Sequence, residues 1–359
     1  MDDAFTGTRA LAQALDTEAL SAWLADQVPG FAGPLTVEQF KGGQSNPTYK
    51  LITPGASYVM RSKPGPVAKL LPSAHAIERE FTVMKALQGT AVPVPHMLAL
   101  CEDEAVIGRA FYVMEFIEGR VLWDQSLPGM SPAERGALYD EMNRVMAALH
   151  SVDFAAAGLA SYGKPGNYFE RQIGRWSKQY QASVTGPNEA MDRLIEWLPL
   201  NIPASARDER EVAIVHGDYR LDNLVFHPTE PRVLAVLDWE LSTLGHPLAD
   251  FSYHCMSWHI QTSGAARGLG GHDLAALGIP DELAYVRRYC ERSGRADMAL
   301  VMRDWNFYLA YNLFRIAAIL QGIAKRVEAG TASSERAREA AAGARPMAEL
   351  GWQFAQRAA

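Results

Sequence analysis

Two short stretches in the middle of the sequence carry side chains suited to metal-assisted phosphoryl transfer. HGDYRLDN, residues 216–223, contains Asp218 and Asn223, and VLDWE follows with Asp238 at the end of an apolar run. Mg²⁺ prefers oxygen ligands, so one or two carboxylates and an amide oxygen suffice when substrate phosphates supply the rest. In such reactions one aspartate orients the attacking hydroxyl, while an asparagine and a second aspartate hold the metal. Either residue type alone is better explained by turn formation, but the ordered set between apolar strands is more specific.

The residues before the linker near 115 predict a small sheet with helices. A helix should begin after Asp16 and end at Pro29-Gly30, and a second should run from about Ser73 to Leu87. Strand patterns occur in LTVEQFKGG, PTYKLIT, SYVMRSK, HMLALCED and AFYVMEFI. Glycine-rich turns separate the first three strands, which favours an antiparallel meander.

The residues after the linker predict a larger, mainly helical part. Ser131 and Glu134 form a capping-box pattern, short strands are expected near 212–238, and the apolar segment 302–324 should be a central buried helix. The fold class is therefore α+β with two lobes, as expected for 359 residues. We expect an N-lobe over 1–114, a hinge over 115–119 and a C-lobe over 120–359.

A phosphoryl-transfer enzyme also needs groups that hold a nucleotide, and the N-terminal part offers them. Backbone N–H groups of the turn FKGGQSNPTY suit phosphates, and either Arg61 or Lys63 on the strand YVMRSK would supply the cation. Glu80, preferred to Glu78, would pair with that cation. The linker FYVMEFIEG would bind adenine through its backbone. The candidate nucleotide-binding residues are Gly42, Gly43, Ser45, Asn46, Arg61, Lys63, Glu80, Glu115 and Phe116.

These motifs resemble the aminoglycoside phosphotransferase-like branch of the protein-kinase fold. The resemblance is stronger to the kinase-like domain fused to, or encoded beside, acyl-CoA dehydrogenases, and it covers most of residues 36–330. It rests on GGQSNPTY, PSAHAIEREF, FYVMEFIEGR, VHGDYRLDNLVFHP, VLDWELSTLGHPLAD and WNFYLAYNLFRIAAILQGIAKR. It implies a bilobal protein-kinase-like fold that uses ATP and Mg²⁺. It also implies these roles: Asp218 as catalytic base, Asn223 and Asp238 as metal ligands, and His216 with Asp250 bracing the catalytic loop.

The resemblance further implies a hydroxyl-bearing acceptor, of the 4-hydroxyacyl-CoA type, that feeds a partner acyl-CoA dehydrogenase. Arg171, Arg175 and Lys178 follow helical spacing and form a face that suits CoA phosphates, although a solvated charged face is the simpler interpretation. Asn312 and Arg315, in the apolar helix, would face either the acceptor or a buried hydrogen-bond network. The alternatives are an aminoglycoside, choline-like or sugar acceptor, or an inactive kinase-like module that binds nucleotide or a partner.

Composition limits the remaining function classes. The net charge of −7 argues against a general nucleic-acid binder. The three cysteines Cys101, Cys255 and Cys290 lack metal or disulfide spacing, and the histidines near Cys255 match no zinc motif. The acidic N-terminus does not resemble a signal peptide, and no run of ~20 apolar residues is apparent, so we expect a cytoplasmic protein without a membrane partner.

Overall fold

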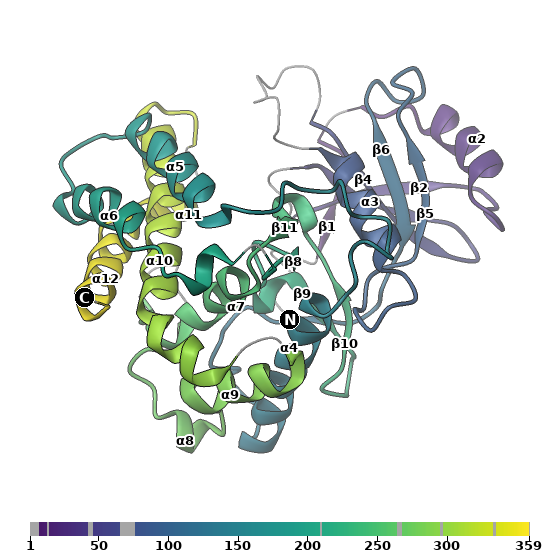
Figure 1. Ribbon diagram of the computed structural model, residues 1–359. Coiled ribbons are helices and arrows are strands. Elements are labelled where there is room, and N and C mark those ends of the chain that lie inside the picture. The colour runs from purple at the N-terminus through teal and green to yellow at the C-terminus, as the bar shows by residue number, and fades with distance from the viewer. Residues whose placement is uncertain are drawn as a thin grey trace. The chain divides into compact units, whose positions relative to one another are not determined.

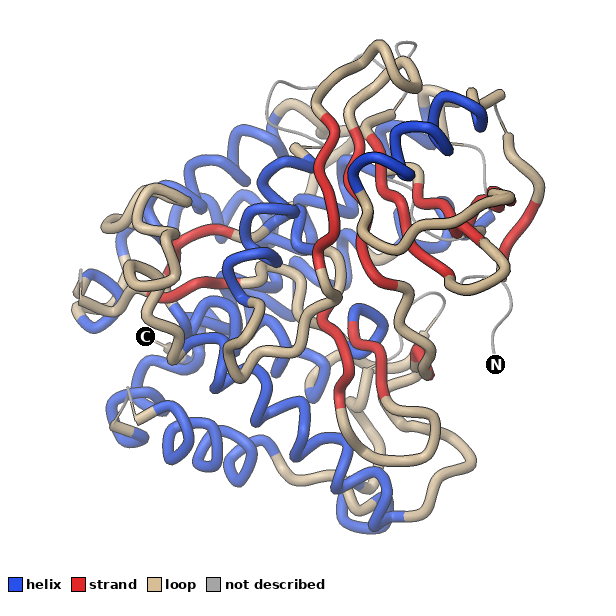
Figure 2. The backbone as a smooth tube through the Cα atoms, turned by 90° about the vertical axis from the view of Figure 1, so that its right-hand side faces the viewer, coloured by secondary structure: helices blue, strands red, loops and turns tan. Residues whose placement is uncertain are grey.

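The chain forms two compact units that each gather segments distant in the sequence. The computed structural model describes residues 7–12, 14–41, 46–64, 76–208, 210–263, 268–294, 297–332 and 335–358. The first unit comprises Met1–Val121, Ala155–Tyr162 and Asp222–Ser242, and the second comprises Leu122–Phe154, Gly163–Leu221 and Thr243–Ala359. Strands dominate the first unit and helices the second (Figures 1 and 2).

An antiparallel sheet with strand order β1-β2-β3-β4-β6-β5 forms the body of the first unit. The expected meander is present, since β2 pairs with β3 and β3 with β4, and β6 then pairs with both β4 and β5. The strands are β1 (Thr8–Arg9), β2 (Thr36–Phe40), β3 (Thr48–Ile52), β4 (Ser57–Ser62), β5 (Met97–Cys101) and β6 (Phe111–Glu115).

Two helices cover opposite faces of this sheet. Helix α2 (Thr17–Gln27) begins at Asp16, whose side chain accepts a hydrogen bond from the N–H of Ala19, and it packs in the core with β4 and β6 residues such as Met60 and Val113. Helix α3 (Ile77–Leu87) lies on the other face, where Phe81 contacts Tyr112. Because cross-strand neighbours share a face, Tyr112 and its β4 partner Arg61 both point toward α3. Residues 73–75 of the expected helix lie outside the described residues.

The boundary between the units differs from the predicted one. We expected residues 120–359 to form a single lobe, but β9 (Leu224–Phe226) pairs with β7 (Arg120–Val121) and with β10 (Val233–Val236) inside the first unit. Val236 also donates its N–H to the Pro93 carbonyl at 2.9 Å. The close approach at Gly119, where a Cβ would lie 2.4 Å from the Phe226 carbonyl oxygen, leaves room for glycine only. These backbone contacts bring the 222–242 segment into the sheet unit.

Helices make up most of the second unit (Figure 1). The expected capping box is present at Ser131, where α4 begins. A two-stranded ladder pairs β8 (Ala213–Val215) with β11 (Thr243–Gly245). The helices are α4 (Pro132–His150), α5 (Tyr168–Gln181), α6 (Glu189–Leu200), α7 (Pro247–Cys255), α8 (Leu274–Leu277), α9 (Glu282–Ser293), α10 (Met298–Glu328), α11 (Glu335–Ala342) and α12 (Ala344–Arg357).

Helix α10 is the central helix of this unit, as its apolar character predicted. It packs against α5, α6, α7, α11 and α12. It is also long and apolar enough to cross a membrane by length and composition alone, which corrects the expectation that no such stretch exists. However, 67% of its most apolar 18-residue window is buried inside the protein. The apolar side chains of α10 therefore pack mainly in the protein core.

Candidate active site

The HGD motif forms a tight loop after β8 in the second unit. Gly217 has a φ of +82°, a left-handed conformation that residues with a Cβ adopt only at a cost. His216 is fully buried, and its Nδ1 accepts the backbone N–H of Asp218 at 3.2 Å. His216 was predicted to brace the loop that carries the catalytic Asp218, and its burial places its ring inside that loop. Its ring therefore holds the loop instead of meeting a substrate.

Asp250, near the start of α7, binds the backbone of this loop. Its Oδ2 accepts the N–H of His216 at 2.6 Å, and its Oδ1 accepts the N–H of Gly217 at 2.8 Å. His150 lies 3.2 Å from Oδ2. Burial alone would raise the pKa of Asp250, but the hydrogen bonds and charges of His150 and His216 hold it below its ordinary value. An ionised Asp250 thus holds the loop through its backbone N–H groups, which is the bracing role that the resemblance implied.

The Asp218 carboxylate is partly exposed and contacts two residues that the sequence interpretation missed. The Tyr253 hydroxyl donates to Oδ1 at 2.5 Å, and Arg220 Nε lies 3.2 Å from the same oxygen. The Asp218 side chain keeps 21% of its surface exposed. Tyr253 follows Asp250 by one helical turn, so the only available signal was that both residues share one face of α7. The site therefore presents a fixed, solvent-accessible carboxylate.

In the first unit, Arg61 on β4 is surrounded by carboxylates. Its Nη2 lies 2.8 Å from Asp238 Oδ1 and 3.5 Å from Glu240, and its Nε lies 3.2 Å from Glu80 Oε2. Burial by itself would lower the pKa of Arg61, but the carboxylates, Glu80 foremost, raise it above its ordinary value. Lys63 instead pairs with Glu78. Of the two candidate cations, Arg61 is the one that faces Glu80, which agrees with the choice of Glu80 over Glu78.

Glu80 is almost completely buried and has further partners besides Arg61. Tyr112 donates its hydroxyl to Oε2 at 3.1 Å, and Asn46 donates its amide to Oε1 at 3.0 Å. Asn46 was predicted as part of a phosphate-covering turn, but its side chain is buried and directed to Glu80. Gly42, Gly43 and Ser45 of that turn lie outside the described residues. Tyr112 was not predicted, although the alternation in AFYVMEFI places it across from Arg61.

Asn223 and Asp238, the predicted metal ligands, lie on adjoining segments of the first unit. The N–H of Leu237 donates to the Asn223 backbone carbonyl at 2.9 Å, which brings the two residues' segments together inside the first unit. Asp238 has a left-handed backbone, with φ +63°, and its carboxylate stays partly exposed beside Arg61. An amide and a carboxylate oxygen on adjoining segments fit a hard cation that keeps several waters. Within the described residues, no cluster of three or more histidine, cysteine or acidic side chains forms a complete metal cage.

The linker after β6 has a defined hydrogen-bond pattern. The Glu115 N–H donates to the carbonyl of His96, the residue before β5, at 2.9 Å, so this donor is already used within the sheet unit. The Lys50 ammonium lies 4.2 Å from the centre of the Phe116 ring. Glu115 and Phe116 thus lie at the end of β6, where the sequence predicted the adenine-binding linker. The Glu115 N–H is excluded as an adenine contact, because it already donates to His96.

The predicted acceptor residues separate into two groups. Arg171, Arg175 and Lys178 are exposed along α5, and Arg171 donates to the carbonyls of Gly166 and Lys164. These backbone contacts favour a structural role for Arg171, and they leave the charged-face interpretation of α5 open.

Asn312 and Arg315 are buried in α10. The Asn312 amide donates to Ser252 Oγ at 2.7 Å and to the Ala249 carbonyl at 3.0 Å, so it belongs to a buried network and not to an acceptor site. Arg315 donates to the Gly217 carbonyl, which places its guanidinium beside the Asp218 loop. Of the two, only Arg315 lies close to the proposed chemistry.

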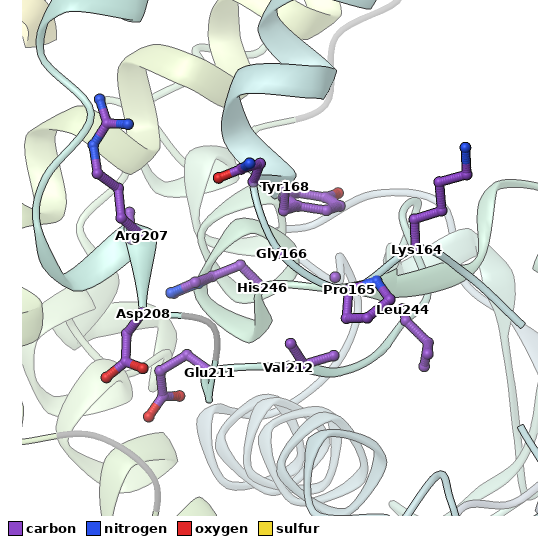
Figure 3. A pocket seen from close by; sticks show the side chains of 13 residues that line it. Lys164, Pro165, Gly166, Tyr168, Arg207, Asp208, Glu211, Val212, Leu244 and His246 are labelled. Carbon is purple, nitrogen blue, oxygen red and sulfur yellow. The ribbon is translucent and has the colours of Figure 1, made fainter. Parts of the chain in front are cut away.

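A pocket lined by residues at the start of α5, among them Tyr168, is too small for a substrate (Figure 3). It has a volume of about 10 Å³, roughly the room needed for one water. In Figure 3 the Lys164 side chain extends away from the other lining residues. A larger depression of about 320 Å³ is lined by Asp140, Ile279, Tyr285 and Arg288, and it contains none of the predicted site residues.

The histidines near Cys255 serve packing instead of metal binding. His254 is buried, and its Nε2 lies 3.0 Å from the Tyr285 hydroxyl. Burial lowers the pKa of His254 from 6.5 to about 4, so its ring is neutral at pH 7. His259 forms a 2.9 Å contact with Glu282. The two histidines therefore have separate protein partners.

Similar proteins are known for nearly the whole chain. Residues 36–288 match the model of a family described as phosphotransferase enzyme family. Acyl-CoA dehydrogenase family member 10 from Mus musculus is 49% identical over 324 residues, which cover 90% of this chain and 29% of that protein. Acyl-CoA dehydrogenase family member 11 from Rattus norvegicus is 43% identical over 95% of this chain and 43% of its own length. The chain therefore spans less than half the length of either relative.

Solved structures support the same fold. A protein from Ralstonia eutropha JMP134, assigned provisionally as an aminoglycoside phosphotransferase, is 65% identical with a TM-score of 0.87, covering 96% of this chain and 99% of its own. An aminoglycoside phosphotransferase solved with ADP and hygromycin B is 16% identical with a TM-score of 0.58, covering 94% and 98%. Choline kinase from Cryptosporidium parvum is 13% identical with a TM-score of 0.65, covering 93% and 96%. The protein-kinase-like α+β fold is therefore confirmed.

Proposed function

Because this chain belongs to the phosphotransferase enzyme family, we propose that it transfers the γ-phosphoryl group of ATP to a hydroxyl of a small molecule. The observation that carries the proposal is the Asp218 carboxylate. It is partly exposed and held at one oxygen by Tyr253 and Arg220, on a loop that Asp250 fixes. A carboxylate fixed in this way can orient an acceptor hydroxyl and take its proton.

The proposed roles follow from the groups in each unit. The acceptor oxygen bonds to the γ-phosphorus, the bond to ADP breaks, and the hydroxyl proton passes to Asp218. Asn223 and Asp238 would hold Mg²⁺, which neutralises charge on the phosphate oxygens when bound. We assign the nucleotide phosphate contact to Arg61 and not Lys63, because Arg61 pairs with the buried Glu80, as the lysine–glutamate pair does in protein kinases.

We propose a hydroxyacyl-CoA, of the 4-hydroxyacyl type, as the acceptor. Two observations support this choice. The mouse and rat relatives bear acyl-CoA dehydrogenase names, and phosphorylation would convert a poor hydroxide leaving group into phosphate for a later dehydrogenase-linked step. In addition, Arg220 contacts Asp218 and Arg315 contacts the adjoining Gly217, so the loop is flanked by positive charge.

This charge distribution separates the acceptor alternatives. Aminoglycosides and choline are cations, and Arg220 and Arg315 would weaken their attraction to the Asp218 carboxylate. An anionic CoA thioester or a neutral sugar hydroxyl meets no such penalty. The inactive-module alternative is disfavoured because Asp218 is not buried in a structural contact but keeps part of its carboxylate exposed.

The test compares the wild type with Asp218→Asn in an ATP-consumption assay. Acceptors should include hydroxyacyl-CoAs, free hydroxy acids, aminoglycosides, choline and sugars, and kcat/KM is measured for each. We expect a hydroxyacyl-CoA to have the highest kcat/KM, and the variant to lose kcat by orders of magnitude while it binds ATP as the wild type does. Wild-type turnover in Asp218→Asn would refute the mechanism, and a preference for cationic acceptors would refute the substrate class.

A further inference from the structure

Helix α7 contacts both the backbone of the HGD loop and the side chain of Asp218. Asp250 accepts the backbone N–H groups of His216 and Gly217, and Tyr253, one turn later, donates to the Asp218 carboxylate at 2.5 Å. One rigid helix thus controls where the loop lies and which way Asp218 points. A hydrogen bond between a neutral donor and a carboxylate is among the stronger kinds, and its short length agrees with that class.

We propose that Tyr253 is a positioning residue that holds Asp218 for phosphoryl transfer, an inference that rests on the proposed function. Tyr253 is buried, and burial together with the neighbouring Asp218 charge raises its pKa well above 10. The phenol therefore stays protonated at every pH at which a kinase works, and it always acts as the donor. Its contact restrains rotation of the Asp218 side chain.

Arg315 on α10 keeps the Tyr253 ring in place. Its guanidinium lies 4.9 Å from the centre of the Tyr253 ring and 5.5 Å from that of Trp176, and it donates to the Gly217 carbonyl. Burial alone would lower the pKa of Arg315, but nearby groups, the Asp218 carboxylate among them, raise it above its ordinary value, so Arg315 remains a cation. Arg315 thus links the loop backbone to the side chain that orients the base.

Two further titratable groups of the same loop contact Asp218. Arg220 contacts Oδ1 at 3.2 Å, and His216 binds the Asp218 N–H. Arg220 is about half exposed, whereas Tyr253 is buried, so Tyr253 is the more ordered of the two side chains on Oδ1. Loss of the Tyr253 hydroxyl leaves Asp218 with a mobile partner, and a hydrogen bond to a charged group corresponds to roughly 10- to 100-fold in rate.

The test uses Tyr253→Phe, which removes one oxygen atom. Tyr139→Phe is the matched control, because Tyr139 is also buried and its hydroxyl also donates a hydrogen bond, to the Gln125 carbonyl at 2.7 Å. For wild type, both variants and Asp218→Asn, we would measure kcat and KM for ATP with a 4-hydroxyacyl-CoA or the best acceptor of the screen. Melting temperatures would show whether each variant is folded.

We expect Tyr253→Phe to lose about 10- to 100-fold in kcat with little change in KM for ATP. Tyr139→Phe should keep the wild-type kcat and KM for ATP. If Asp218→Asn is inactive but Tyr253→Phe matches the wild type in kcat, this inference is overturned and the proposed function stands. If the wild type transfers no phosphoryl group, or Asp218→Asn retains full activity, both are overturned.

Discussion

Arg61 offers a sharp test of the structure because it neutralises a carboxylate that is almost fully buried. Glu80 is 1% exposed and Arg61 11% exposed, and their Oε2 and Nε atoms lie 3.2 Å apart. Arg61→Met would leave the Glu80 charge with only the neutral donors Tyr112 and Asn46. Breaking a buried ion pair by removing one partner costs about 3–5 kcal/mol of unfolding free energy.

The double variant Arg61→Met/Glu80→Gln removes both charges and should recover most of that loss. Glutamine can still accept from Tyr112 or Asn46, so we expect a coupling free energy of about 2–3 kcal/mol between the two positions. Arg61→Lys keeps a charge beside Glu80 but cannot contact three carboxylates at once. Because the charge is kept, Arg61→Lys should remain nearly as stable as the wild type. Because the carboxylate contacts are fewer, its kcat/KM for ATP should fall about 10-fold.

Urea unfolding followed by circular dichroism would give the free energies, and hydrogen exchange at β4 and α3 would localise the effect. Arg232→Met is the matched control in the same unit, since Arg232 and its partner Glu230 are both about half exposed and their contact should contribute little. A stability of Arg61→Met equal to that of the control would refute the buried ion pair. So would a double variant no more stable than Arg61→Met alone.

Three further results are expected. His254 has a pKa lowered from 6.5 to about 4 by burial, so its neutral ring stabilises the fold fully above pH 6.5. About 3 kcal/mol should be lost as the pH falls to 4, and His254→Gln should flatten the urea-measured stability curve across that window. Gly217→Ala should lower kcat and cost about 1–2 kcal/mol in urea unfolding, because its φ of +82° is unfavourable for alanine. An unchanged kcat and stability would contradict the loop geometry. Asp238→Ala should abolish the Mg²⁺-dependent increase in ATP affinity seen by calorimetry, and a retained increase would remove Asp238 from the metal site.

Local patterns in the sequence predicted most of the secondary structure. The strands around Tyr49, Met60 and Val113 follow from short strand-like runs, and the start of α4 follows from the capping box at Ser131. These are interactions between near neighbours along the chain, which residue order alone reveals. The spacing of Asp218, Asn223 and Asp238 indicated the chemistry for a similar reason, because a loop and the strand after it lie within one short segment.

Contacts between distant segments were decided only in the folded protein. The choice between Arg61 and Lys63 as the partner of Glu80 depended on strand register and on the rotation of α3. The Asn46 side chain donates to Glu80, a contact that its position in the sequence did not reveal. The sequence determined which residues are able to do the chemistry, since that depends on side-chain type and local spacing. The tertiary structure decided which of them share a hydrogen bond, as with Tyr253 and Asp218, because a separation of an ångström or two between side chains depends on the packing of whole elements.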